Sequence, residues 1–484
     1  MNKKQMSYYV IPFLGTMVCL WYIKAATCNI VYTDYIRLVN SYLPDVWNPD
    51  KFFVPDVLTR IPIHYLGRII NVAFFNYSTT FDMILGVLGL GLSGFVLARY
   101  CILRQLGYGW YLLLMLSLFG LNKWEMLING TGWGHFLAFA FFYYHYIVID
   151  RVINNTGKKR DQAVLWLLPS FITLGLAGPY CAVYSATVAV FYTAAAGYKI
   201  CKLYRDKDKN RSLTSLTNLT EQIRYWVYGC ISVMLPLFLY MWSNSYAVED
   251  HAGAKDITLW AAAAADPGFF PRFLLKAFAS MLTGKELLEK WIEQGLITDG
   301  TVYLMGVIII AGYVLAFYLN WRYRLYRKTM LPLILLVSGL GNHAIVLLTR
   351  YIFLKEDYGM SSRYALQYQV GILGIILTFG FLWKRMRLFW SRLLAAAFCA
   401  CLLLGHGCTN YREWKMAPHR EYYVEEIAAL ALRFEEASDD ELRKKFEYRD
   451  KEPGSGAKIR QALTILKEQQ WNVFCRGQTK EETK

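Results

Sequence analysis

The sequence predicts an all-α integral membrane protein that crosses the bilayer many times. Of its 484 residues, 56% are hydrophobic and only 18% are charged, whereas soluble domains average about 45–50% apolar and about 25% charged residues. One crossing needs roughly 20 helical residues, and eleven segments are apolar over nearly that length. Lys and Arg residues recur in every second connection between these segments, as they do in cytoplasmic loops.

The eleven predicted spans each have about the length of one crossing, with some slack at their ends. The third of them is the shortest. The spans lie at about residues 8–27, 81–103, 107–121, 132–150, 162–178, 180–199, 225–246, 302–320, 330–353, 366–383 and 389–408.

Basic residues predict the orientation of the chain. Lys3 and Lys4 precede the first span, and basic residues follow each even-numbered span, from Arg104 after the second to Lys384 after the tenth. The positive-inside bias then places the N-terminus in the cytoplasm, and an odd number of spans places the C-terminus outside. The two lysines before an apolar run could also mark a signal peptide, which would leave the downstream orientation unchanged.

The charge balance argues against a nucleic-acid site, and the cysteine pattern argues against a zinc site or a disulfide framework. The net charge is +16, but basic loops account for it in a membrane protein, so nucleic acid is not expected as a partner. Most of the ten cysteines lie inside apolar runs. They lack paired zinc spacing and a secreted disulfide framework, so we expect them to be small core residues.

Most of the polar variety outside the spans lies in two long external connections, 28–80 and 247–301, and in a helical tail. We predict a transmembrane module at 1–408 and an extracytoplasmic helical tail at 409–484. Ser438 and Glu441 form a capping box at the start of one tail helix. Apolar residues at helical spacing predict two further tail helices. One contains Val424, Ile427, Ala428 and Ala431, and the other contains Ile459, Ala462, Leu463 and Leu466. Three short helices make a marginal core alone, so we expect them to pack on the outer face of the bundle.

Two external segments are predicted to lie on the membrane surface as amphipathic helices. The first has the apolar residues Tyr32, Ile36, Val39 and Leu43 at helical spacing. The second, at 269–282, mixes Phe, Leu and Ala with two basic residues.

Polar residues of the first external loop are candidates for chemistry. Asp34 lies at the start of the first amphipathic helix, where partial desolvation would raise its pKa and improve it as a general base. An acidic residue there could equally serve only the helix dipole. Asp56, Arg60 and His64 recur at four-residue spacing, although Pro62 limits any helix, and an exposed ion pair would give the same pattern.

Two later connections add a carboxylate, an aromatic ring and guanidinium groups. Trp124 could anchor at the interface or stack on a sugar, whereas Glu125 at the bilayer rim is costly unless it is paired or used. Arg350 and Arg363 flank the last external link, and Tyr364 follows. The two arginines could bind a lipid-linked phosphate bidentately or merely snorkel to ordinary headgroups. His145, inside the fourth span, is interpreted as a hydrogen-bonded core histidine.

Four short features occur in order along most of the chain. They are an acidic residue in the first external loop (Asp34), W-E-x-L before the fourth span (Trp124, Glu125, Leu127), S-R-Y before a late span (Ser362, Arg363, Tyr364) and W-N-V-F near the end of the tail (Trp471 to Phe474). This layout resembles the GT-C superfamily of integral-membrane glycosyltransferases, in particular bacterial members that decorate lipopolysaccharide and cell-wall glycans. The resemblance implies a GT-C-like fold and a place in the bacterial plasma membrane.

The resemblance also implies a donor sugar carried on polyprenyl phosphate and a glycan or lipid-linked acceptor. Asp34 would act as the base or orient the acceptor, and Arg363 would hold the donor phosphate. Asp56 with Arg60 resembles a second acidic and basic element of some members. Better-known members have an adjacent acidic pair where this chain has only Asp34, and hard cations favour several oxygen ligands, so a divalent cation is left open as a cofactor.

The predicted activity is the transfer of one monosaccharide by single displacement, with inversion at the anomeric carbon. No nucleotide is expected, since the chain has no P-loop or dinucleotide fingerprint. The predicted catalytic residues are Asp34, Asp56 and Glu125, and the predicted substrate-binding residues are Arg60, His64, Trp124, Arg350, Arg363 and Tyr364.

Two other functions are left open. A transporter or lipid flippase would show internal repeats and broken helices; no convincing repeat is seen, but Gly86, Gly89, Gly91 and Gly94, and the stretch 339–342, could interrupt their spans. A polysaccharide polymerase or ligase would use the same kind of donor and would differ in moving an oligosaccharide block.

Overall fold

The computed structural model describes residues 3–53, 61–154, 156–207, 213–245, 253–449, 452 and 454–475. In this part of the chain the regular structure is helical, and no strand is present. Ten of the helices are long and apolar enough to cross a membrane. The predicted class, an all-α multi-pass membrane protein, is therefore confirmed.

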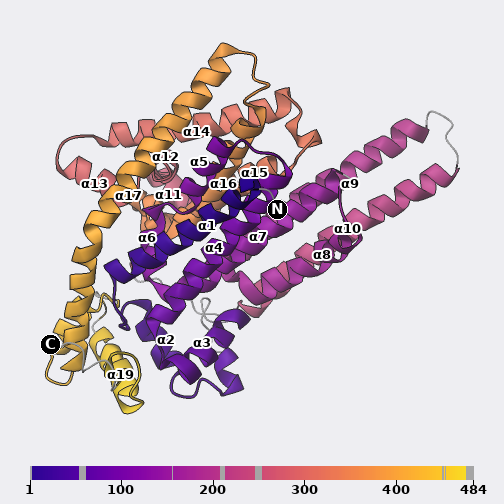
Figure 1. The fold of residues 1–484 in the computed structure, drawn as a ribbon. Helices are drawn as coiled ribbons and strands as arrows, with labels where there is room; N and C mark the ends of the chain where they lie inside the picture. The colour runs from indigo at the N-terminus through magenta and orange to yellow at the C-terminus, as the bar shows by residue number, and fades with distance from the viewer. Residues whose placement is uncertain are drawn as a thin grey trace.

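The long helices form one bundle (Figure 1). In the third span a helical turn, η2 (Leu121–Lys123), joins two helices, α5 and α6. The helices of the ten spans are α1 (Lys3–Ala26), α4 (Thr79–Leu103), α5 (Tyr108–Leu118) with α6 (Trp124–Ile128), α7 (Trp133–Ile153), α9 (Cys181–Lys207), α10 (Leu213–Ser243), α14 (Asp299–Arg322), α15 (Leu331–Arg350), α16 (Ala365–Leu382) and α17 (Phe389–Leu432). The other helices are α2 (Asp34–Tyr42), α3 (Pro62–Phe75), α8 (Lys159–Ser170), α11 (Leu259–Ala265), α12 (Phe269–Ala279), α13 (Lys285–Glu293), α18 (Asp439–Lys445) and α19 (Ser455–Glu468).

The predicted span at 162–178 is not among the ten, so the expected count of eleven was wrong by this criterion. This segment forms α8 and a π-helix, η4 (Phe171–Leu176). Lys159, Arg160 and Asp161 occupy its first turn, which leaves an apolar part shorter than the roughly 20 residues of one crossing.

The same segment nevertheless runs along the whole of α7. At its start, Asp161 accepts two hydrogen bonds from Arg151, near the end of α7. Beyond its end, the ring of Tyr180 lies 4.2 Å from that of His135, near the start of α7. The segment is therefore antiparallel to α7.

Glycines let the central helices approach closely. A Cβ on Gly339 of α15 would lie 2.4 Å from the Cα of Gly371 on α16, and one on Gly89 of α4 would lie 2.7 Å from the backbone of Leu137 on α7. Small residues at such crossings are typical of membrane helix pairs. Both α4 and α15 are continuous through their glycines, so these glycines do not interrupt the spans.

A buried histidine of α7 is hydrogen-bonded inside the bundle. His145 of α7 is buried, and its two ring nitrogens lie 2.6 and 3.3 Å from the hydroxyls of Tyr184 and Tyr192. This confirms the interpretation of His145 as a hydrogen-bonded core residue.

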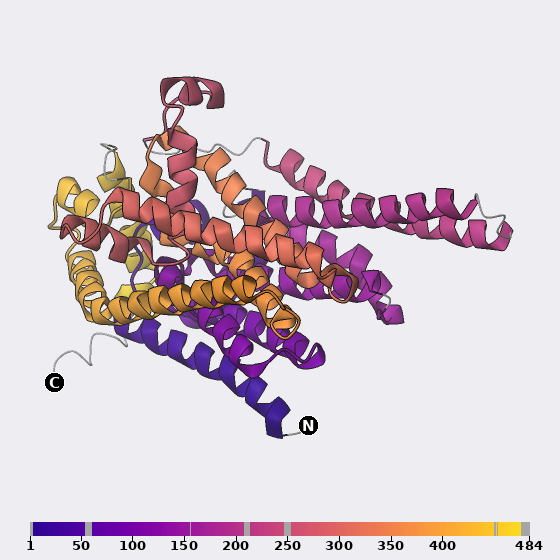
Figure 2. The ribbon, with the colours of Figure 1, turned by 90° about the horizontal axis from the view of Figure 1, so that it is seen from above.

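Figures 1 and 2 show α9 and α10 side by side, extending beyond the other helices.

The last long helix carries the chain from the bundle into the tail. α17 has 44 residues, a length of about 66 Å at 1.5 Å per residue. The predicted boundary at residue 408 falls inside it, and the predicted helix around residues 424–431 is its final part. Ser438 caps α18 by accepting a hydrogen bond from the backbone N–H of Glu441 at 3.2 Å. This is one of the two hydrogen bonds of the predicted capping box.

A second apolar core joins the tail to the first loop. Ile36, Val39 and Leu43 of the first loop are buried in it with apolar residues of α18, α19 and the end of α17. Figure 1 shows α2 and α19 at the same end of the bundle. The tail therefore packs on the bundle as expected, but the prediction that α2 lies on the membrane was wrong, because the tail covers its apolar face.

The second predicted surface helix is also enclosed by protein. Phe273 and Ala277 of α12 are fully buried, and Lys276 is 5% exposed. α12 packs against α14 and against η8 (Glu356–Met360). The sequence pattern showed an apolar face correctly, but it could not show that other helices cover that face.

Asn472 fastens the tail to the first loop. Its side chain accepts a hydrogen bond from the Val31 backbone N–H at 3.1 Å and donates to the Asn29 side chain at 2.9 Å and to the Tyr77 carbonyl at 3.1 Å. Asn472 is 1% exposed, so these bonds are shielded from water.

Replacing this side chain should loosen the tail. We expect Asn472→Ala to lower the free energy of unfolding by about 1–3 kcal/mol, because it strands buried polar partners, and to speed proteolysis within 433–475. Unfolding in detergent and limited proteolysis measure both effects. Gln469→Ala, at an exposed position of the same tail, is the control, and equal behaviour of the two variants would contradict the role of Asn472.

Candidate active site

Three predicted residues from distant parts of the chain meet at one end of the bundle. Arg363 lies in the short helical turn η9 (Ser362–Tyr364), Glu125 in α6 and Asp34 at the start of α2. The Arg363 Nε donates a hydrogen bond to Glu125 Oε1, and its Nη1 lies 4.0 Å from Asp34 Oδ2. The Ser362 hydroxyl donates to the other oxygen of Glu125 at 2.9 Å.

The two carboxylates differ in their availability. Both oxygens of Glu125 are engaged by η9, and its side chain is 24% exposed. Asp34 is 36% exposed and lies beyond hydrogen-bond distance from Arg363. Asp34 therefore keeps lone pairs free to accept a proton, whereas Glu125 is placed to orient the Arg363 side chain.

Neighbouring residues fix the start of α2, which presents Asp34. The Thr33 backbone N–H donates to the Phe446 carbonyl of the tail at 3.0 Å. On the opposite side, the Tyr35 hydroxyl donates to Asp82 Oδ2 at 3.0 Å. A Cβ on Gly130 would lie 2.4 Å from this hydroxyl, so only glycine allows the chain before α7 to pass so closely. Burial, with Asp82 beside it, holds the pKa of Tyr35 well above its ordinary value, so the hydroxyl stays a donor.

A second guanidinium, that of Arg350, lies near the residue that follows Arg363. The Arg350 guanidinium is 5.9 Å from the ring centre of Tyr364, the residue that follows Arg363. The Arg350 Nε is buried and has no hydrogen-bond partner among the described residues. Arg350 therefore has one donor without a partner besides its contact with Tyr364, whereas Arg363 already binds Glu125.

Trp124 is held by α17. The Arg420 guanidinium lies 3.6 Å from the centre of the Trp124 ring. Arg420 in turn pairs with Glu413 at 2.5 Å and donates to the Tyr22 hydroxyl at 2.9 Å. One face of the indole is thus occupied, and only the other could stack on a sugar. Arg420 was not singled out from the sequence, because it is distant from Trp124 along the chain.

Among the other predicted residues, the structure describes His64. His64 is 4% exposed, and its burial, with His135 and Arg68 nearby, holds its pKa well below the ordinary value, so the ring is neutral. Asp56 and Arg60 lie outside the described residues. Arg68 continues the four-residue spacing of Arg60 and His64, and this spacing could have identified it. The small pocket that contains His64 is lined by Leu38, His64, Arg68, Tyr77, Asp82, Thr131 and Trp133.

The described side chains do not fit a divalent cation. Within the described ranges, no group of three or more His, Cys, Asp or Glu side chains could hold a metal ion. The carboxylates of Asp34 and Glu125 both face the Arg363 guanidinium.

Comparison with known proteins finds no matching family model and no match among the curated proteins or the solved structures.

The contact between Glu125 and Arg363 can be tested without an activity assay. We expect a double-mutant cycle of Glu125→Gln and Arg363→Gln to give a coupling energy of about 1 kcal/mol or more in detergent unfolding, because the pair is partly shielded. The control cycle uses Glu221 and Arg224, a pair with side chains 71% and 62% exposed, where about 0–0.5 kcal/mol is expected. Coupling no larger than in the control would contradict the contact.

Proposed function

We propose that the chain is a membrane glycosyltransferase that moves one monosaccharide from a polyprenyl-phosphate donor to an extracytoplasmic glycan or lipid-linked acceptor. The observation that carries this proposal is the meeting of Asp34 with Arg363, 4.0 Å apart and both accessible to solvent. Transfer of a sugar from a phosphate needs a base for the acceptor and a cation for the leaving group. These two groups supply both.

The reaction is a single displacement. The acceptor hydroxyl oxygen forms a bond to the anomeric carbon of the sugar, and its proton passes to the Asp34 carboxylate. The bond between the anomeric carbon and the phosphate oxygen breaks, and polyprenyl phosphate leaves with the bonding electron pair. Arg350 and Arg363 stabilise the negative charge that develops on this phosphate. Attack opposite the leaving group inverts the anomeric carbon.

A groove in the apolar part of the bundle supports a lipid-linked substrate. Its volume is about 670 Å³, within the range of about 300–1,000 Å³ that ligand pockets occupy. It runs between α1, α5 and α17 and includes Phe119 and Asn410. The Asn410 side chain accepts a hydrogen bond from the Leu121 N–H of η2 at 2.8 Å, and η2 packs against η9. An isoprenoid chain in this groove would lie close to the segment that carries Arg363.

The glycine-rich spans do not support the transporter alternative. α4 and α15 continue through the glycine-rich stretches, whereas carriers bind their substrates at broken helices. A polymerase or ligase would use the same site, and the size of the transferred unit separates it from this proposal.

Removing the carboxylate of Asp34 should abolish transfer. We expect the purified protein to release polyprenyl phosphate from a polyprenyl-phosphate monosaccharide, and Asp34→Asn to slow this about 10²- to 10⁴-fold by loss of the base. Asp45→Asn, exposed in the same loop, should keep the wild-type rate. Near-normal turnover by Asp34→Asn would remove Asp34 from the base role. Transfer of oligosaccharide blocks alone would favour the polymerase or ligase.

Arg350 should contribute to donor binding through its planar fork. We expect Arg350→Ala to raise the KM for the donor about ten- to 100-fold, and Arg350→Lys to raise it less, since Lys keeps the charge but loses bidentate geometry. Steady-state kinetics with varied donor measure this. An unchanged KM in both variants would show that Arg350 does not touch the phosphate.

A further inference from the structure

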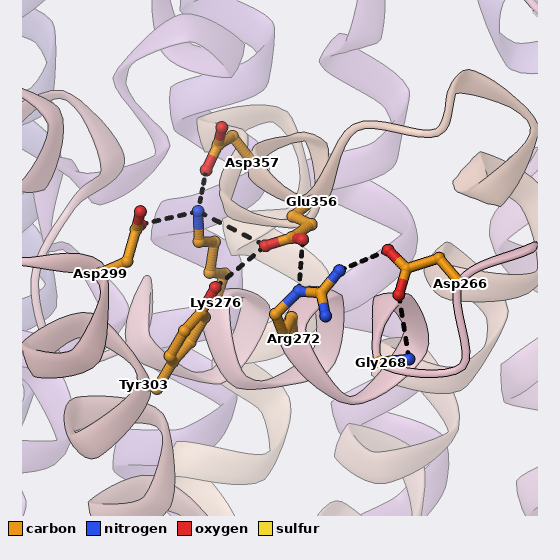
Figure 3. A network of polar contacts seen from close by, with 8 residues as sticks. All are labelled: Asp266, Gly268, Arg272, Lys276, Asp299, Tyr303, Glu356 and Asp357. Atoms are coloured by element: carbon orange, nitrogen blue, oxygen red, sulfur yellow. Dashed lines mark hydrogen bonds and ion pairs between the residues drawn. The ribbon is translucent and has the colours of Figure 1, made fainter.

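A network of charged side chains holds the segment that leads to Arg363. It joins the external helix α12 to η8 and to the start of α14 (Figure 3). We call it the charged clasp, and it consists of Asp266, Arg272, Lys276, Asp299, Glu356 and Asp357.

Lys276 is the centre of the charged clasp. Its Nζ lies 2.6 Å from Asp357, 2.9 Å from Asp299 and 3.7 Å from Glu356, and its side chain is only 7% exposed. Burial by itself lowers the pKa of Lys276, but the hydrogen bonds to Asp357 and Asp299 outweigh it, so the pKa lies above its ordinary value. The ammonium is therefore charged at neutral pH, and it offsets the repulsion among the three carboxylates.

The second cation of the charged clasp holds Glu356 from the other side. Arg272, one turn before Lys276 on α12, donates from Nε to Glu356 Oε1 and pairs with Asp266. The Tyr303 hydroxyl of α14 donates to Glu356 Oε2 at 3.1 Å. Figure 3 shows these groups converging on η8 from two helices. Both acidic residues of η8 are thus bound by cations of α12.

Close packing links η8 with α12 along the rest of its length. A Cβ on Gly359 would lie 2.9 Å from the Phe273 ring, and Met360 is 1% exposed. Only Ser361 separates η8 from η9. The segment 356–364 is therefore held at its start by the charged clasp and near its end by Glu125, which binds Ser362 and Arg363.

We infer that Lys276 is a positioning residue. Through Asp357 and Glu356 it fixes η8, and through η8 it sets where Arg363 presents its guanidinium to the donor phosphate. This inference rests on the proposed glycosyl transfer. In this inference α12 supports the donor site.

Kinetics distinguish this role from a purely structural one. We expect Lys276→Met to raise the KM for a polyprenyl-phosphate monosaccharide about tenfold or more, with a smaller change in kcat, because a displaced cation weakens donor binding. Lys276→Arg should restore most of the donor affinity. Asp357→Asn removes the same contact from a half-exposed position and should shift the KM in the same direction even where Lys276→Met folds poorly. Lys285→Met, from an ion pair on the neighbouring α13, is the control and should leave the KM unchanged.

A second readout does not depend on catalysis. In Ser361→Cys protein, thiol labelling at residue 361, followed by mass spectrometry, should be about fivefold or more faster when Lys276→Met is also present, because the segment opens more often. Unchanged labelling together with an unchanged donor KM would overturn the inference. If the wild-type chain transfers no sugar, the proposed function fails, and the labelling rate alone then decides whether Lys276 fixes the segment.

Discussion

The contact of one guanidinium with two carboxylates organises the end of the bundle where the polar residues gather. Arg363 joins η9 to α6 through Glu125 and faces the start of α2 through Asp34. An acid at the rim of a bilayer is costly unless it is paired, and Arg363 removes that cost for Glu125. Asp34 stays at the edge of this contact, beyond hydrogen-bond distance from Arg363.

Most of the surrounding structure maintains this contact. The tail covers the apolar face of α2 and holds Thr33 and Val31 by hydrogen bonds, so a segment more than 400 residues from Asp34 helps to position it. α17 passes the site on its way to the tail and stacks Arg420 on Trp124. On the other side, α12 holds η8. The long connections between the spans thus support short turns whose side chains form the candidate site.

The sequence predicted the class of fold because apolar length and basic loops are direct consequences of the bilayer. It also placed Asp34, Glu125 and Arg363 in separate external connections. It could not predict that α2 and α12 would be covered by protein, since an amphipathic pattern shows an apolar face but not its partner. It could not show that Glu125 is bound on both oxygens, because the pairing depends on how distant helices end. Arg363 was therefore predicted to bind the phosphate of a donor or of ordinary lipid headgroups, whereas in the structure its guanidinium binds Glu125.

The central claim is that Asp34 and the two arginines converge on one polyprenyl-phosphate sugar. A cryo-electron microscopy structure with this donor bound tests it most directly. We expect the phosphate on Arg350 and Arg363, with the anomeric carbon facing a space beside Asp34 that admits an acceptor hydroxyl within about 3–3.5 Å. A phosphate bound away from both arginines, or a donor sugar that Asp34 does not face, would contradict it.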